Sequence, residues 1–204
     1  GWGPGGGAGA PLATEAPRPV LPAVTDPVTG LERQALAVMV QLPLMAGAAG
    51  ADSIEAAAFA NPVHRAVFEA VQAAGGVARA LDEVRALAVD GRGREEVERA
   101  ALARWVEQVR LGAGPEVDAA LTALAVVELP VAGRRGAGEG LDADSAERYA
   151  RDVITSLARM GVNRRLTELR GRQRRMSPQD EGYREVFEEI VGLENKRMQL
   201  SMRS

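Results

Sequence analysis

Apolar residues recur at helical spacing along most of this chain, and this periodicity constrains its fold more than any other feature. No stretch alternates between apolar and polar residues over the length of a strand, as a half-buried strand would. Only 3% of the residues are aromatic, so aliphatic side chains must fill the core. The sequence predicts an all-α fold, with a helical bundle followed by a long helix and a C-terminal antiparallel helical hairpin.

The first 28 residues differ from the rest of the chain. They are rich in glycine and proline and show no apolar periodicity, so they cannot bury enough surface to offset the entropy lost on ordering. We predict a flexible linker over 1–28, a helical bundle subdomain over 29–160 and a hairpin subdomain over 161–204. A linker in this position favours a fragment of a longer protein whose other domains lie upstream.

Capping signals predict where the helices of the bundle begin. Thr29 and Glu32 have the spacing of a capping box, and Pro43 is expected to end or kink that first helix. Asn61 and Pro62 are typical of an N-cap followed by proline at the first helical position. Further helical patterns cover residues 81–88, 94–111 and 115–129, and a loop is expected over 131–140.

A long helix is expected from a cap at Asp144 or Ser145 toward Met176, a length of roughly 45–50 Å. Before Gly161 its apolar residues form two stripes, and after Gly161 only one stripe continues. A broad apolar face packs against several helices and a narrow one against a single partner. The first half should therefore belong to the bundle and the second half should project from it, with Gly161 as a point where the helix can bend.

The last helix is predicted to pack on this projecting half. Ser177 and Pro178 should end the long helix and begin the last one, which reaches about Leu200. Opposite charges on the two helices favour an antiparallel pairing with its turn at 176–178. The basic residues are Arg159, Arg164, Arg165, Arg170, Arg172, Arg174 and Arg175, and the acidic ones are Asp180, Glu181, Glu185, Glu188, Glu189 and Glu194.

A two-helix hairpin cannot bury all of its apolar residues, and exposed apolar surface rimmed by charge is typical of a partner site. We predict such a site at the tip and outer face of the hairpin. Its residues are Arg172, Arg175, Met176, Tyr183, Phe187, Leu193, Met198 and Leu200.

Composition argues against most catalytic and metal-binding classes. The chain has no cysteine and one histidine, which rules out thiolate zinc sites, cysteine nucleophiles and histidine-rich metal sites. We expect His64 to be structural or exposed, and we expect no catalytic or metal site. The glycine-rich segments follow no strand and lack the Gly-Lys-Ser/Thr ending of a phosphate-binding loop.

Charge and hydropathy bound the partners and the location. No apolar run approaches the ~20 residues of a membrane span, and no secretory signal is evident, so we expect a cytoplasmic protein with no membrane partner. The net charge of -3 argues against a general nucleic-acid binder. The arginines between 159 and 175 are expected to face solvent or protein, with contact to nucleic acid as the alternative.

Two stretches together resemble the C-terminal domain of bacterial DNA primases. The first contains Gln-Leu-Pro at 41–43 and Phe-Ala-Asn-Pro at 59–62. The second, over 162–197, is similar to the family's terminal hairpin, in which a serine-containing turn joins a basic helix to an acidic and apolar one. The resemblance covers 30–200 in order, with residues 78–140 matching only in helical character.

The resemblance implies a helicase-interaction domain. Such a domain docks on the N-terminal domains of a DnaB-like replicative helicase and recruits RNA primer synthesis to the replication fork. The parent protein would be an enzyme, a DNA primase, with its zinc and magnesium in domains outside this sequence and no cofactor here. In some primases the bundle also binds the acidic C-terminal tail of single-stranded-DNA-binding protein, and Arg33 stands at a matching position.

Two other functions fit the same pattern. One is the N-terminal oligomerisation domain of a replicative helicase, which shares the bundle but would carry its linker after it. The other is a helical protein that dimerises through its hairpin into a four-helix bundle.

Overall fold

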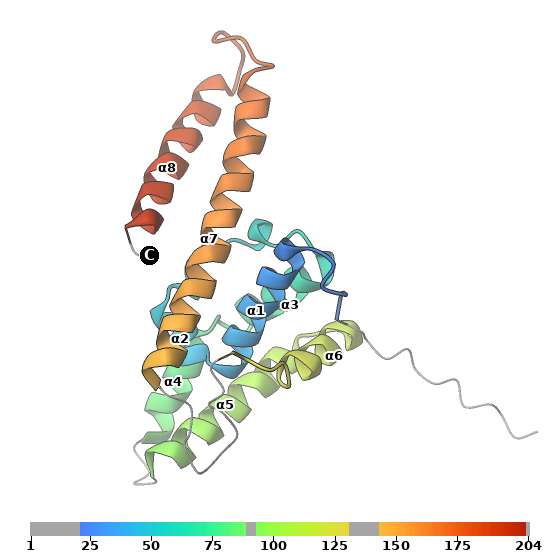
Figure 1. The fold of residues 1–204 in the computed structure, drawn as a ribbon, viewed down its shortest axis with the longest axis vertical. Coiled ribbons are helices and arrows are strands. Elements are labelled where there is room, and N and C mark those ends of the chain that lie inside the picture. The colour runs from blue at the N-terminus through green and yellow to red at the C-terminus, as the bar shows by residue number, and fades with distance from the viewer. Residues whose placement is uncertain (1–20, 89–92, 131–142, 203–204) are drawn as a thin grey trace, which may run out of the picture.

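Every regular element in the described part of the chain is a helix, in a computed structural model that covers residues 21–88, 93–130 and 143–202 (Figure 1). The predicted all-α class is therefore confirmed, whereas the loop expected at 131–140 and most of the expected linker lie outside these ranges. In chain order the elements are α1 (Pro27–Gln41), α2 (Pro43–Ala48), the 3-10 helices η1 (Ala51–Ser53) and η2 (Ala56–Ala58), α3 (Pro62–Ala73), α4 (Ala78–Leu87), α5 (Arg94–Leu111), α6 (Pro115–Leu124), α7 (Ala143–Gln173) and α8 (Tyr183–Ser201).

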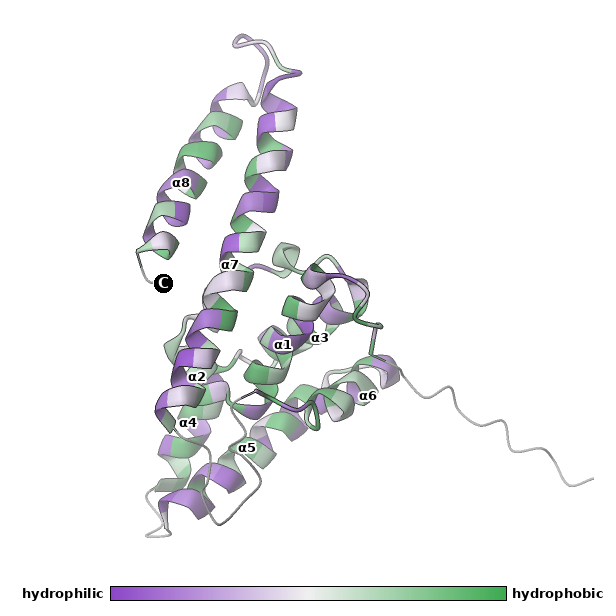
Figure 2. Cartoon of the chain, viewed as in Figure 1, coloured by the Kyte–Doolittle hydropathy of each residue, from purple (hydrophilic) through white to green (hydrophobic). Residues whose placement is uncertain are grey.

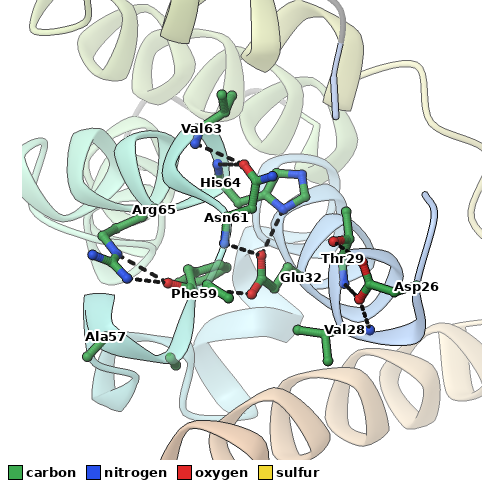
Figure 3. Close-up of polar contacts among 12 residues, drawn as sticks. Asp26, Val28, Thr29, Glu32, Ala57, Phe59, Asn61, Val63, His64 and Arg65 are labelled. Carbon is green, nitrogen blue, oxygen red and sulfur yellow. Dashed lines mark hydrogen bonds and ion pairs between the residues drawn. The ribbon is translucent and has the colours of Figure 1, made fainter. Parts of the chain in front are cut away.

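Helix α1 begins earlier than the predicted capping box, because an Asp-Pro pair precedes it. The Asp26 carboxylate accepts hydrogen bonds from the backbone N–H groups of Val28 at 2.8 Å and Thr29 at 2.9 Å, and Pro27 opens the helix (Figure 3). The predicted box at Thr29 and Glu32 is wrong. Asp26 already satisfies the orphan N–H groups that a cap serves, and the Glu32 side chain points into the core instead.

Helix α1 is the centre of the bundle. It packs against α2, α3, α6 and α7, and its residues 35–40 are all buried. A helix surrounded in this way has to be apolar around most of its circumference, which accounts for the unbroken run Ala-Leu-Ala-Val-Met-Val. The α1–α2 junction is tied to α6, because the Gln41 amide donates to the Leu124 and Val127 carbonyls at 2.7 and 2.8 Å.

The turn between α3 and α4 is built on two glycines with positive φ. Gly75 and Gly76 have φ of 91° and 69°, and a Cβ on Gly76 would meet the Asp52 carboxylate at 2.3 Å. Asp52 caps α4 through the N–H groups of residues 77 and 78. Trp105, which is fully buried, donates its indole N–H to the Gly76 carbonyl at 2.9 Å. This turn therefore fixes α4 and α5 against the rest of the bundle.

Helix α7 belongs to both parts of the molecule. Its first half packs against α1, α2 and η2, and its second half pairs with α8 (Figure 1). The hairpin has a small hydrophobic cluster of its own, separate from the main core. Its buried members are Val162, Leu166, Leu169, Val186 and Ile190. The predicted change from a broad to a narrow apolar face is thus visible as the passage from one core to the other.

The ends of the two long helices differ from their predicted positions. Helix α7 begins at Ala143, so Asp144 and Ser145 lie in its first turn and do not cap it. Ser177 and Pro178 do not begin α8. Its N-cap is Gly182, with φ of 83°, and the loop before it is closed by Asp180, whose carboxylate accepts from the Ser177 N–H at 2.8 Å. This hydrogen bond uses the serine as a turn residue, so the connection is longer than predicted.

Gly161 is a site of close packing, and a bend of the helix at this residue stays a prediction. Helix α7 runs through it without interruption, and a Cβ built on Gly161 would lie 2.6 Å from the Ala58 Cβ and 3.1 Å from its Cα. A distance this short requires the helix or the 3-10 segment to move. Glycine is needed here because it lets the two backbones approach each other.

We predict that Gly161→Ala lowers the free energy of unfolding by about 1–3 kcal/mol through overpacking. The measurement is urea denaturation followed by circular dichroism. Gly192→Ala on α8 is the matched control, since nothing lies within 4 Å of its Cβ position; it should stabilise by about 0.5–1 kcal/mol. Equal stability of Gly161→Ala and the wild type would contradict the packing role.

We also predict a pH-dependent contribution from the Asp26 cap. Hydrogen bonds from the backbone and the hydroxyl of Thr29 hold the pKa of Asp26 below its ordinary value of 3.8. A carboxyl whose folded-state pKa is depressed stabilises the protein above its unfolded pKa, and the contribution is lost as pH falls through the folded value. The difference in melting temperature between wild type and Asp26→Ala should therefore begin to shrink as the pH falls below 3.8, and it should vanish once the pH has passed the lower folded-state pKa. A difference that persists in still more acidic solution would argue against charge as the source.

Candidate partner-binding surface

The outer face of α8 carries a stripe of exposed apolar side chains. Phe187, Val191, Met198 and Met202 are 51%, 45%, 59% and 73% exposed. At 100° per residue these four positions fall within about 60° of one another on the helix. The opposite face, with Val186 and Ile190, is buried against α7. Figure 2 shows that hydrophobic and hydrophilic residues are interspersed along α8. We call the four exposed residues the α8 stripe.

The structure divides the predicted apolar site residues into two groups. Phe187 and Met198 are exposed on the α8 stripe. Met176, Leu193 and Leu200 are partly buried and pack against the hairpin's own core, and Tyr183 is half-buried. These residues therefore contribute mainly to the packing of the hairpin, because a small two-helix core needs every apolar side chain that faces it.

Two members of the α8 stripe were not predicted. Val191 and Met202 lie four residues after Phe187 and Met198, respectively, so each continues the face that its neighbour begins. The signal was present in this spacing. It was missed because apolar residues of α8 were assigned to the site without separating its two faces.

Charged side chains surround the hairpin helices. The Arg165 guanidinium donates to Glu189 at 2.8 Å, and this hydrogen bond raises the pKa of Arg165. A second pair across the hairpin joins Arg170 and Glu194. These pairs confirm that opposite charges bridge α7 and α8, although exposed pairs of this kind stabilise only weakly.

The two predicted basic site residues lie at the tip end of α7. Arg172 and Arg175 are exposed, and neither has an ion pair with any residue in the described ranges. Exposed arginines without an ion pair are suited to the polar rim of an interface. Their role in partner binding stays a prediction.

Inside the bundle, Glu32 and His64 form a fully buried pair (Figure 3). His64 Nδ1 lies 3.0 Å from Glu32 Oε2. The same carboxylate accepts from the backbone N–H groups of Ala60 and Asn61, at 2.5 and 3.2 Å. Asn61 in turn caps α3 through the N–H groups of residues 63 and 64. His64 is therefore a structural residue, as predicted, and it is buried.

The next question is whether the described residues could hold a metal ion or cross a membrane. They contain no group of three or more His, Cys, Asp or Glu side chains placed to hold a metal ion. None of the helices in the described ranges combines the length and apolar character that a membrane crossing requires. Arg33 is half-buried on α1, and its contact with an acidic tail stays a prediction.

This fold and surface define a class of protein: an all-helical docking module, in which a bundle supports a projecting hairpin with an unpartnered apolar stripe. The sequence match is more specific. The chain belongs to the family described as DNA primase DnaG DnaB-binding, which matches residues 32–185. The resemblance to primases is thereby confirmed, and the alternative of a helicase N-terminal domain is not favoured.

Known proteins similar to this chain are mycobacterial primases. DNA primase from Mycobacterium leprae is 28% identical over 177 residues, covering 86% of this chain and 23% of the relative. DNA primase from Mycolicibacterium smegmatis is 28% identical over 184 residues, covering 88% and 24%. The chain thus spans about a quarter of the length of the curated relatives that it matches.

A solved structure has the same fold. It is described as the helicase binding domain of primase from Mycobacterium tuberculosis, and it superposes with a TM-score of 0.55 at 25% sequence identity. The match covers 85% of this chain and 91% of the other.

We predict that Glu32→Ala lowers the free energy of unfolding by about 3 kcal/mol, because it leaves two backbone N–H groups and a buried imidazole without their acceptor. Urea denaturation measures this, with Glu69→Ala as the control, since Glu69 is exposed on α3. A loss no larger than that of the control would show that the buried carboxylate is dispensable.

Proposed function

We propose that this chain is the domain through which a DNA primase docks on its replicative helicase, and that docking brings RNA primer synthesis to the replication fork. The observation that carries the proposal is the α8 stripe. Four exposed large apolar side chains lie together on this one face of α8. The remaining exposed large apolar side chains of the described residues, such as Leu111 and Val126, are scattered over the bundle.

The stripe has the composition of a protein interface. Large apolar side chains, including a phenylalanine and two methionines, form its centre, and such residues are enriched at the cores of interfaces. Charged residues border it, with Arg184 paired to Glu188 and Arg197 paired to Glu194. The apolar centre would supply affinity, and the charged border would supply specificity and a faster encounter.

Helix α8 is also accessible to a partner helix. Within the described chain its extensive contacts are with α7 alone, so its outer face is open along nearly its whole length (Figure 1). An exposed amphipathic helix commonly binds by laying its apolar face against a groove or helix of the partner. The N-terminal domains of a replicative helicase are the partner that the primase family supports.

The helicase-binding description of the similar mycobacterial structure supports the same partner. Arg172 and Arg175 extend the proposed surface toward the hairpin tip, where rim charges would make the association rate depend on salt. The zinc and magnesium expected of a whole primase would belong to its other domains.

We predict that Val191→Glu weakens binding to the N-terminal domain of the cognate helicase by about 2 kcal/mol, roughly a 30-fold increase in Kd. Calorimetric titration measures the change, and a charge placed at the centre of the stripe is its physical cause. Leu111→Glu is the matched control. Leu111 is 80% exposed at the end of α5 and should tolerate the charge.

Wild-type affinity for Val191→Glu would contradict docking through the α8 stripe. Light scattering on the wild-type chain without helicase tests the alternative in which the hairpin dimerises. A dimer that Val191→Glu converts to a monomer, together with no binding to the helicase domain, would favour self-association as the function of the stripe.

A further inference from the structure

Residues 55–61, between η1 and α3, lie at the junction of bundle and hairpin, and we call them the 55–61 segment. The main core and the hairpin core share no residue, so the angle between the two parts depends on how α7, which is continuous through the junction, is held there. The segment contacts both. It packs on α7 through η2, and Glu55 forms an ion pair with Lys196 of α8 at 3.5 Å.

We propose that Arg164 is the positioning residue that fixes the angle of the hairpin relative to the bundle. Its guanidinium donates to the carbonyl oxygens of Ala57 at 3.2 Å and Ala58 at 3.1 Å. Among the described residues, Arg164 is the last residue along α7 that forms a hydrogen bond with the bundle. Beyond Arg164, the hydrogen bonds of α7 stay within the helix or cross to α8.

Arginine suits this position for a geometric reason. Its guanidinium is planar and holds its donors in a fixed fork, so Nη1 binds the two successive carbonyls while Nη2 faces the Glu32 carboxylate. These contacts together restrict the rotation of α7 and its distance from the segment. Gly161 lies one turn earlier and brings the helix backbone against Ala58. The two contacts are three residues apart and therefore share one face of α7.

The segment to which Arg164 donates is itself held in place by hydrogen bonds. The fully buried Glu32 carboxylate binds the N–H groups of Ala60 and Asn61, and Arg65 donates to the Phe59 carbonyl at 2.8 and 3.1 Å. Arg164 also approaches Glu32 Oε1 at 4.0 Å, which places a positive charge beside the buried carboxylate. A buried charge is costly unless it is paired, so the same contact couples α1, the 55–61 segment and α7.

The second link between hairpin and segment is weaker. In the Lys196–Glu55 pair, the lysine side chain is 37% exposed and the glutamate 68% exposed. Exposed pairs of this kind stabilise by about 0–1 kcal/mol. Loss of Arg164 should therefore leave both cores folded while the hairpin samples a wider range of angles.

This freedom would be visible at the hairpin tip. From Arg164 to the end of α7 is nine residues, or about 14 Å along the helix, so a tilt of about 20° moves the tip by about 5 Å. The α8 stripe would move with it. That consequence for docking rests on the proposed function, whereas the angle itself is a property of the free chain and can be measured without any helicase.

The experiment is a distance measurement between spin labels by double electron–electron resonance. The chain has no native cysteine, so Glu69→Cys on α3 and Glu181→Cys at the hairpin tip, both exposed, give a single labelled pair. We expect Arg164→Ala to broaden and displace the distance distribution while circular dichroism stays unchanged. Arg174→Ala is the control, because Arg174 is exposed and has no ion pair within the described ranges.

Arg164→Lys should fall between the wild type and Arg164→Ala, because an ammonium group keeps a positive charge but lacks the planar fork that reaches the two carbonyls through one nitrogen and Glu32 through the other. This variant also decides the matter if Arg164→Ala fails to fold cooperatively. A wild-type distribution in Arg164→Ala, or in Arg164→Lys should the alanine variant not fold, would overturn the proposal. Equal broadening in the Arg174→Ala control would do the same.

Discussion

The buried carboxylate of Glu32 is the interaction on which the arrangement of this protein depends. It lies on the central helix, fully removed from solvent, and holds the backbone of Ala60 and Asn61 together with the imidazole of His64. A charge in such a place is tolerated only when hydrogen bonds and a counter-charge surround it. Those partners come from the 55–61 segment, α3 and α7, so the carboxylate, which itself lies on α1, determines how four parts of the chain meet.

Helix α7 connects the bundle to the hairpin. Its first half completes the bundle and its second half forms the hairpin, and no break in the helix separates the two tasks. Side chains separate the two tasks. Before Gly161, two apolar stripes face the bundle; Arg164 then hydrogen-bonds to the 55–61 segment; and beyond it a single apolar stripe faces α8. A continuous helix carries the surface proposed for docking away from the bundle that supports it.

Much of this was predictable from local pattern. Helical spacing and caps such as Asn61-Pro62 gave the all-α class and the starts of α3, α5 and α6, and the loss of one stripe after Gly161 indicated the projecting hairpin. The failures have a common cause. The Glu32 carboxylate binds residues 28 and 29 positions away, and the close approach of Gly161 to Ala58 spans more than 100 residues, so local spacing cannot report either. Glu32 was therefore read as half of a capping box, and the packing of Gly161 against Ala58 was not predicted.

The separation of the two cores limits what one optical reporter can describe. Trp105 is the tryptophan of the described residues and lies fully buried in the main core, bonded to the turn before α4. Tyr183 begins α8 and belongs to the hairpin. The emission of Trp105 should therefore follow the bundle and report little on the hairpin, so an unfolding curve from this emission alone would describe only part of the protein.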